Sequence, residues 1–128
     1  MNKAKVTTGL RILMGVLWLI FGTNFFFHFL PMPPPAESMG KVLGALFETG
    51  YFFPFVKITE IVLGLMLVTN SFALLALIIS APITINIVLM HGLLDPAGVG
   101  AGVLMLILNI VLGYLYIEYY KPVLRMKV

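Results

Sequence analysis

The chain has 128 residues, of which 61% are hydrophobic and 10% charged, and its mean hydropathy is +1.09. Globular domains carry about 25% charged residues, so a water-soluble protein is excluded and lipid is the expected solvent. The absence of cysteine excludes disulfides and cysteine-ligated metal centres. The net charge is +3, but the basic residues cluster at the chain ends beside apolar segments, which is unlike a nucleic-acid-binding patch.

The first apolar segment, residues 9–30, is longer than the core of a signal peptide, and no small-residue cleavage site follows it. We therefore expect it to remain in the protein as a membrane span. Four prolines between positions 31 and 35 form a stiff exit from this span. Residues 38–49 then predict a short amphipathic helix, which lies in the membrane interface or over the mouth of the bundle. Its apolar face carries Met39, Val42, Leu43, Leu46 and Phe47.

Three further apolar segments follow at residues 51–69, 72–91 and 98–119. A helix crosses a bilayer with about 20 mostly apolar residues, and each segment is close to that length. Turn-forming pairs, Asn70-Ser71 and Asp95-Pro96, separate the three segments. The sequence thus predicts one all-α domain over residues 1–128. This domain is a four-transmembrane-helix bundle with a short amphipathic helix in the first outer loop.

The positions of lysine and arginine predict the orientation of the bundle. Each chain end carries three cations, whereas the loop after the first span has only Lys41 and the loop at Asp95 has none. Segments rich in Lys and Arg stay on the cytoplasmic side of a membrane. We therefore expect a multi-pass protein of the cell inner (plasma) membrane with cytoplasmic N- and C-termini.

Polar side chains interrupt the apolar segments at similar depths. Lys57 and Glu60 are three residues apart in the second span, so they can pair on one helix face. At 1.5 Å per residue, Asn24, Asn86 and Glu60 lie roughly 8–9 Å below the outer ends of their spans. An ionisable residue in a span indicates a functional site. We therefore predict a ligand-binding site near the outer face, formed by Glu60, Lys57, Asn24, His28, Asn86 and His91.

Each of these residues also has a structural interpretation. Lys57 can extend its amine to the interface, and Glu60 and the amides, including the deeper Asn109, can join helices. The histidines can lie at the rim of the bundle. Gly98 and Gly102 are a weak signal for a close helix contact. The catalytic residues stay unknown, and no pattern predicts a metal site.

Three segments of the chain resemble the DoxX-like family of small four-helix integral membrane proteins. They are RILMGVLWLIFGTNFFFHFLPMPPP, FETGYFFPFVKITEIVLGLMLV and APITINIVLMHGLLDPAG. The resemblance itself extends over nearly the whole chain. The block TGY-x-x-P-x-x-K-x-x-E, which ends at Glu60, is their most specific part. Many relatives have a lysine where this chain has Phe25 or Phe26. The resemblance implies a four-helix fold and, for some members, a link to quinol oxidation, membrane redox complexes or receptor assembly.

Three functions are consistent with this sequence. The first is binding of a quinone- or lipid-like ligand in the service of a membrane redox complex, with quinone as the candidate cofactor. Whether the chain is an enzyme, as a component of a quinone-linked oxidoreductase, stays open because it has no self-contained catalytic motif. The second function is a non-catalytic assembly or chaperone-like role, and the third is a minimal transporter. The expected partners are the lipid bilayer, membrane redox proteins and further copies of the chain.

Overall fold

The computed structural model describes residues 2–128, and these residues form helices and loops without any strand. Four of the helices are long and apolar enough to cross a membrane. The sequence-based prediction of an all-α, four-span membrane bundle with one additional short helix is therefore confirmed. In chain order the elements are α1 (Lys3–Phe27), α2 (Glu37–Glu48), α3 (Phe52–Thr69), α4 (Ala73–Leu94), the 3₁₀ turn η1 (Pro96–Gly98), α5 (Val99–Leu115) and α6 (Ile117–Tyr120).

The first span is shifted toward the N-terminus relative to its predicted range of 9–30. It begins at Lys3 because the Asn2 side chain accepts a hydrogen bond from the Ala4 amide at 2.8 Å, which is a favoured helix start. It ends at Phe27 because His28 adopts the left-handed conformation, with φ of 52°. These ends depend on capping contacts, which hydropathy does not reveal.

The last two spans also differ from their predicted ranges. α4 continues to Leu94, past the predicted end at 91, and the Asp95 amide still donates to the His91 carbonyl at 2.9 Å. α5 stops at Leu115, before the predicted end at 119, because the chain turns at Tyr116 into the separate α6. α4 is therefore longer at the α2 end, and α5 shorter at the termini end, than the sequence indicates.

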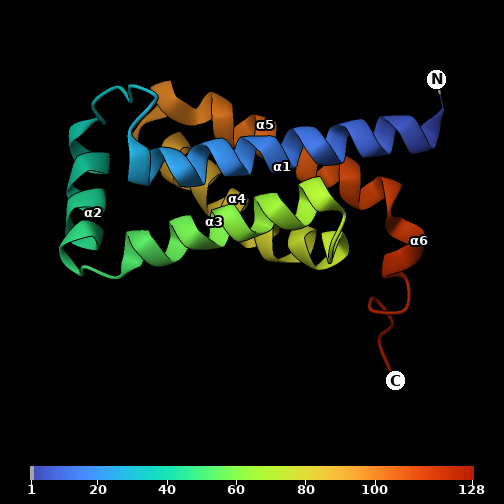
Figure 1. Ribbon diagram of the computed structural model, residues 1–128. Coiled ribbons are helices and arrows are strands. Elements are labelled where there is room, and N and C mark those ends of the chain that lie inside the picture. The colour runs from blue at the N-terminus through green and yellow to red at the C-terminus, as the bar shows by residue number, and fades with distance from the viewer. Residues whose placement is uncertain (1) are drawn as a thin grey trace.

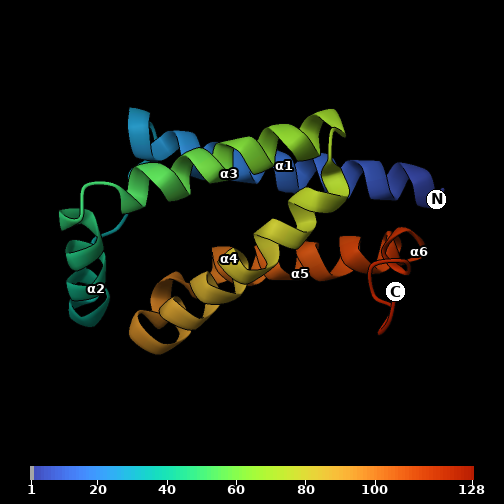
Figure 2. The same ribbon diagram turned by 90° about the horizontal axis from the view of Figure 1, so that it is seen from below.

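The four spans are arranged as two antiparallel pairs, α1 with α3 and α4 with α5 (Figure 1). The pairs are joined by the turn from α3 to α4 and diverge from there toward α2 (Figure 2). Both chain ends lie at one end of the bundle, which we name the termini end. α2 lies across the opposite end, which we name the α2 end (Figure 1).

α1 and α3 approach closely because glycines lie where the two helices cross. A Cβ atom on Gly64 would be 2.8 Å from the Gly15 carbonyl oxygen, and one on Gly22 would be 3.0 Å from the Lys57 carbonyl oxygen. Small residues at such crossings allow the backbones of membrane helices to pack against each other. Gly102, from the glycine pair noted in the sequence, packs against α4 within the chain.

The apolar core lies toward the termini end, and all four spans contribute to it. Its buried residues are Met14, Trp18, Leu63, Leu67, Ala73, Ala76, Leu77, Met105, Leu108 and Leu112. Toward the α2 end the packing changes, since α4 has no buried residue beyond Thr84. Buried polar side chains lie on both sides of this point, with Arg11 toward the termini end and Asn24 toward the α2 end.

α2 covers the α2 end and contacts both α3 and α4. The Ser38 hydroxyl donates a hydrogen bond to the Leu94 carbonyl at 3.0 Å, which attaches α2 to the end of α4. Met39 points inward and is buried, whereas Val42 and Phe47, from the predicted apolar face, stay exposed. α2 thus covers the interior on one side and presents apolar groups to its surroundings on the other.

Candidate functional site

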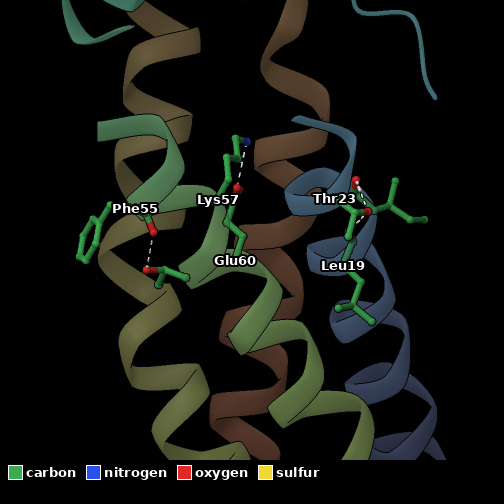
Figure 3. Close-up of polar contacts among 7 residues, drawn as sticks. Leu19, Thr23, Phe55, Lys57 and Glu60 are labelled. Atoms are coloured by element: carbon green, nitrogen blue, oxygen red, sulfur yellow. Dashed lines mark hydrogen bonds and ion pairs between the residues drawn. The ribbon is translucent and has the colours of Figure 1, made fainter. Parts of the chain in front are cut away.

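Lys57 and Glu60 form an ion pair on α3, with 2.9 Å between Nζ and Oε2. The Glu60 side chain is 3% exposed and the Lys57 side chain 23% exposed, so the amine reaches an interior carboxylate from the direction of the α2 end. Figure 3 shows the pair along α3, whereas the Phe55 ring points away from it. Because a buried carboxylate is stable only when it is paired or hydrogen-bonded, this ion pair identifies a polar region inside the bundle.

Trp18 and Thr84 place two further buried polar groups within about one helical turn of the depth of Glu60. Both residues are 0% exposed, and Trp18 Nε1 and Thr84 Oγ1 have no hydrogen-bond partner among residues 2–128. Across the crossing of α1 and α3, Gly64 contacts Leu19 and Gly22 contacts Ile61. Trp18 therefore lies about one helical turn from Glu60, on the side of the termini end. Counted from the turn between α3 and α4, Glu60 and Thr84 lie about 14 and 16 Å along their helices. We name Lys57, Glu60, Trp18 and Thr84 the polar layer.

The unpartnered hydroxyl of Thr84 differs from other span threonines in this chain. Thr23, Thr59 and Thr69 each donate to the carbonyl four residues earlier, at 2.5, 2.8 and 2.6 Å. Figure 3 shows two of these bonds, from Thr23 to Leu19 and at the Phe55 carbonyl. Such bonds satisfy a hydroxyl that has no access to water. The Thr84 hydroxyl forms no such bond within residues 2–128.

Asn24 and His28, two of the predicted ligand-binding residues, form the end of α1. The Asn24 side chain accepts a hydrogen bond from the Leu30 amide at 2.7 Å and donates to the Leu30 carbonyl at 3.3 Å. His28 is exposed and closes the helix in the left-handed conformation. The structure therefore uses the Asn24 side chain to hold the chain after α1, and it does not bring His28 into the interior.

Asn86 and His91, the predicted residues of the third span, also lie apart from Glu60. Asn86 is exposed, and its contact is with the Met90 sulfur on the same helix, at 3.4 Å. His91 packs against η1, where a Cβ atom on Gly98 would be 2.7 Å from the imidazole Nδ1. Of the six predicted residues, the structure therefore brings together only Lys57 and Glu60 in the polar layer.

Asn109 joins the two helices of the second pair. Its side-chain nitrogen donates to the Ser80 hydroxyl at 2.7 Å and to the Leu77 carbonyl at 3.2 Å. Both acceptors lie just before Pro82, which interrupts the hydrogen bonding of α4. This is the interhelical role that the sequence offered as the structural interpretation of Asn109.

Arg11 is a buried cation that sequence reasoning assigned only to the membrane orientation. It is 6% exposed, and its guanidinium donates to the Leu67 carbonyl and, at 3.4 Å, to the Val68 carbonyl. A cation at these carbonyls stabilises the C-terminal end of α3. The spacing of Arg11, Met14 and Trp18 along one helix face is the signal that could have indicated its burial.

Among residues 2–128, no group of three or more His, Asp or Glu side chains is placed to hold a metal ion. No family model, curated protein or solved structure matches this chain. The interpretation of the polar layer therefore rests on the geometry and chemistry of its own residues.

Proposed function

We propose that this integral membrane protein is DoxX-like, binds a quinone- or lipid-like amphiphile, and serves a membrane redox complex. The observation that carries this proposal is the polar layer, in which an ion pair and two unpartnered polar groups are buried within about one helical turn of each other in depth. The core next to it, to which Trp18 itself belongs, is otherwise apolar. An amphiphile suits such an interior, because its head can bond to the polar groups while its tail contacts apolar side chains.

The hydrogen-bonding capacity of the polar layer narrows the chemistry of the head group. The Trp18 indole donates only, and the Lys57 ammonium has three protons, of which Glu60 needs one. The Thr84 hydroxyl donates or accepts, and a Glu60 carboxylate accepts. A head group with a carbonyl oxygen near a hydroxyl would match this set. Quinones, which interconvert carbonyl and hydroxyl groups, and lipids with ester and hydroxyl groups both belong to this class.

The proposed location is the cell inner membrane, with the termini end in the cytoplasm. Six of the eight Lys and Arg residues belong to the N- and C-terminal segments at this end, and such cations remain on the cytoplasmic side. The polar layer then lies in the half of the membrane that is nearer the outer face, beneath α2.

Trp18 provides a direct test, because it is the only tryptophan in the chain and belongs to the polar layer. The detergent-solubilised protein is titrated with a short-tailed benzoquinone and, separately, with a fatty acid, while Trp18 emission is recorded. Mass spectrometry identifies any molecule that co-purifies. We expect saturable changes in emission with one of these probes. In Glu60→Gln, the Kd should rise about ten- to hundredfold, as expected for loss of a charge-assisted hydrogen bond.

Two threonine substitutions provide a matched comparison. Thr84→Val removes the unpartnered interior hydroxyl and should weaken binding, whereas Thr59→Val removes an exposed hydroxyl that already bonds to the Phe55 carbonyl. The proposal fails if neither probe gives a saturable change and no molecule is retained. It also fails if the two threonine variants weaken binding equally.

A second candidate, a non-catalytic assembly role, is favoured by an apolar groove of about 240 Å³ between α3 and α4. Its lining residues are Phe55, Ile58, Thr59, Val62, Leu63, Met66 and Ile79. A transmembrane helix from a redox partner or from a second copy of the chain could pack there. Ile58→Cys introduces the single cysteine of the chain into this groove. A specific crosslinked product that is unchanged by Glu60→Gln, combined with an empty polar layer, would support the assembly role.

A further inference from the structure

Charge is distributed unequally between the two ends of the bundle. The termini end carries six cations and one carboxylate, Glu118, whereas the rest of the chain carries two cations and four carboxylates. Among residues 2–128, Lys3, Lys5, Arg125 and Lys127 form no ion pair. The termini end therefore has an excess of positive charge that the described part of the chain does not neutralise.

A hollow of about 520 Å³ lies at this end, between the turn from α3 to α4 and the break from α5 to α6. Asn70, Phe72, Tyr116 and Tyr119 line it together with apolar residues of the first turn of α4. Asn70 and Phe72 both have φ of 57°, and a left-handed conformation is uncommon for a bulky residue such as phenylalanine. Within residues 2–128, the Asn70 amide and the hydroxyls of Tyr116 and Tyr119 make no side-chain hydrogen bond.

α6 fixes the direction in which the chain leaves this hollow. The Tyr120 hydroxyl donates a hydrogen bond to the Leu74 carbonyl at 2.7 Å, which attaches α6 to the start of α4. The segment 121–128 then turns away from the bundle (Figure 1). It alternates cations with exposed apolar side chains, namely Lys121, Val123, Leu124, Arg125, Met126 and Lys127.

We propose that the hollow and segment 121–128 together bind the head group of an anionic phospholipid from the leaflet at the termini end. The amide and phenol groups would hydrogen-bond the phosphate and glycerol oxygens, and the cations would supply the charge attraction. The exposed Val123, Leu124 and Met126 would enter the interface beside the lipid. This pattern of basic and apolar residues beside a membrane span fits a lipid surface better than a free anion, because a free anion has no apolar part that could contact the apolar side chains.

The lack of cysteine makes this proposal directly testable. Met126→Cys, labelled with an environment-sensitive fluorophore, is placed in nanodiscs of phosphatidylcholine with or without phosphatidylglycerol. We expect blue-shifted, stronger emission only with phosphatidylglycerol, and retention of that lipid in native mass spectrometry. Lys121 is paired with Glu118. Changing the other two cations of the segment, Arg125 and Lys127, to glutamine should reduce lipid affinity about fivefold per cation. Lys41→Gln, which removes an exposed cation at the α2 end, is the matched control and should leave the affinity unchanged.

A second variant separates the hollow from the charge of segment 121–128. Asn70→Gly keeps the left-handed turn and removes the amide, so it should reduce lipid retention while the cations remain in place. Equal emission and retention with both lipids would overturn the proposal, as would equal losses in Lys41→Gln. Displacement of the lipid by inorganic phosphate at constant ionic strength would also overturn it, because that result identifies a free anion as the ligand.

Discussion

Gly64→Ala and Gly113→Ala should change the stability of the bundle in opposite directions, although each adds one methyl group to a span. A Cβ atom on Gly64 would be 2.8 Å from the Gly15 carbonyl oxygen and 2.7 Å from Cγ of Leu19. No atom lies within 4 Å of a Cβ on Gly113. The first methyl group therefore meets the neighbouring helix, and the second enters open space.

The expected difference follows from these distances. The 2.8 Å contact is about 0.6 Å shorter than the start of ordinary van der Waals contact at 3.4 Å. One of the two atoms belongs to a backbone, so α1 and α3 must separate. Overpacking of this kind costs about 1–3 kcal/mol. Both variants gain about 1 kcal/mol of helix propensity over glycine, which cancels in the comparison. Gly64→Ala should therefore be less stable than Gly113→Ala by about 1–3 kcal/mol.

Unfolding in mixed micelles, as the fraction of denaturing detergent increases, gives the free energy of unfolding of each variant. Circular dichroism follows the helices and Trp18 emission follows the interface of α1 and α3. Gly113→Ala should be at least as stable as the unchanged protein. Equal stabilities of the two variants, or a more stable Gly64→Ala, would refute the close approach of α1 and α3.

Three further predictions concern buried charges and a tyrosine. Arg11→Met should lower the free energy of unfolding by about 1.5–3 kcal/mol in the same micelle assay, because the carbonyl groups at the end of α3 lose a charged donor. Lys57→Met should lower the free energy of unfolding by about 3–5 kcal/mol, because it isolates a buried carboxylate. The double variant Lys57→Met/Glu60→Leu should approach the original stability. A double variant as unstable as the single one would contradict this pairing. Burial, with a contribution from Tyr116, raises the pKa of Tyr120 from 10.0 to about 12. The native state thus holds the Tyr120 proton more tightly than the unfolded chain does. The contribution of this phenol to the free energy of unfolding is present below pH 10 and should be lost between pH 10 and 12. Tyr120→Phe should remove that pH dependence.

The sequence predicts the spans of this protein well because hydropathy and length are summed over many residues. The ends of the helices depend instead on single contacts. Asn2 starts α1 before the apolar segment begins, and Tyr116 ends α5 inside an apolar segment. Neither contact changes the hydropathy of the segment, so the predicted boundaries are displaced by several residues while the number of spans is correct. The short η1 and α6 were not predicted.

Depth along a helix predicts the candidate site only in part, because depth does not define the direction of a side chain. Asn86 lies at the predicted depth but faces outward, and Asn24 lies at that depth but bonds to its own chain. Lys57 and Glu60 form their predicted pair because both residues share one helix face. Trp18 was not predicted because an apolar segment accommodates tryptophan as a core residue, and its N–H becomes informative only when its surroundings are known.

The proposal of ligand binding, as opposed to a purely structural role, is supported by the unpartnered groups of the polar layer. Burial of a polar group without a hydrogen bond costs about 1–3 kcal/mol, so Trp18 and Thr84 together cost about 2–6 kcal/mol, compared with about 5–15 kcal/mol for the whole stability of a typical domain. A polar residue that joins helices forms its hydrogen bonds inside the protein, as Asn109 does with Ser80. Trp18 and Thr84 form none among residues 2–128. Phenylalanine and valine would fill much the same space without this cost. The penalty disappears when a bound head group supplies the hydrogen bonds, whereas a helix-joining role leaves it in place.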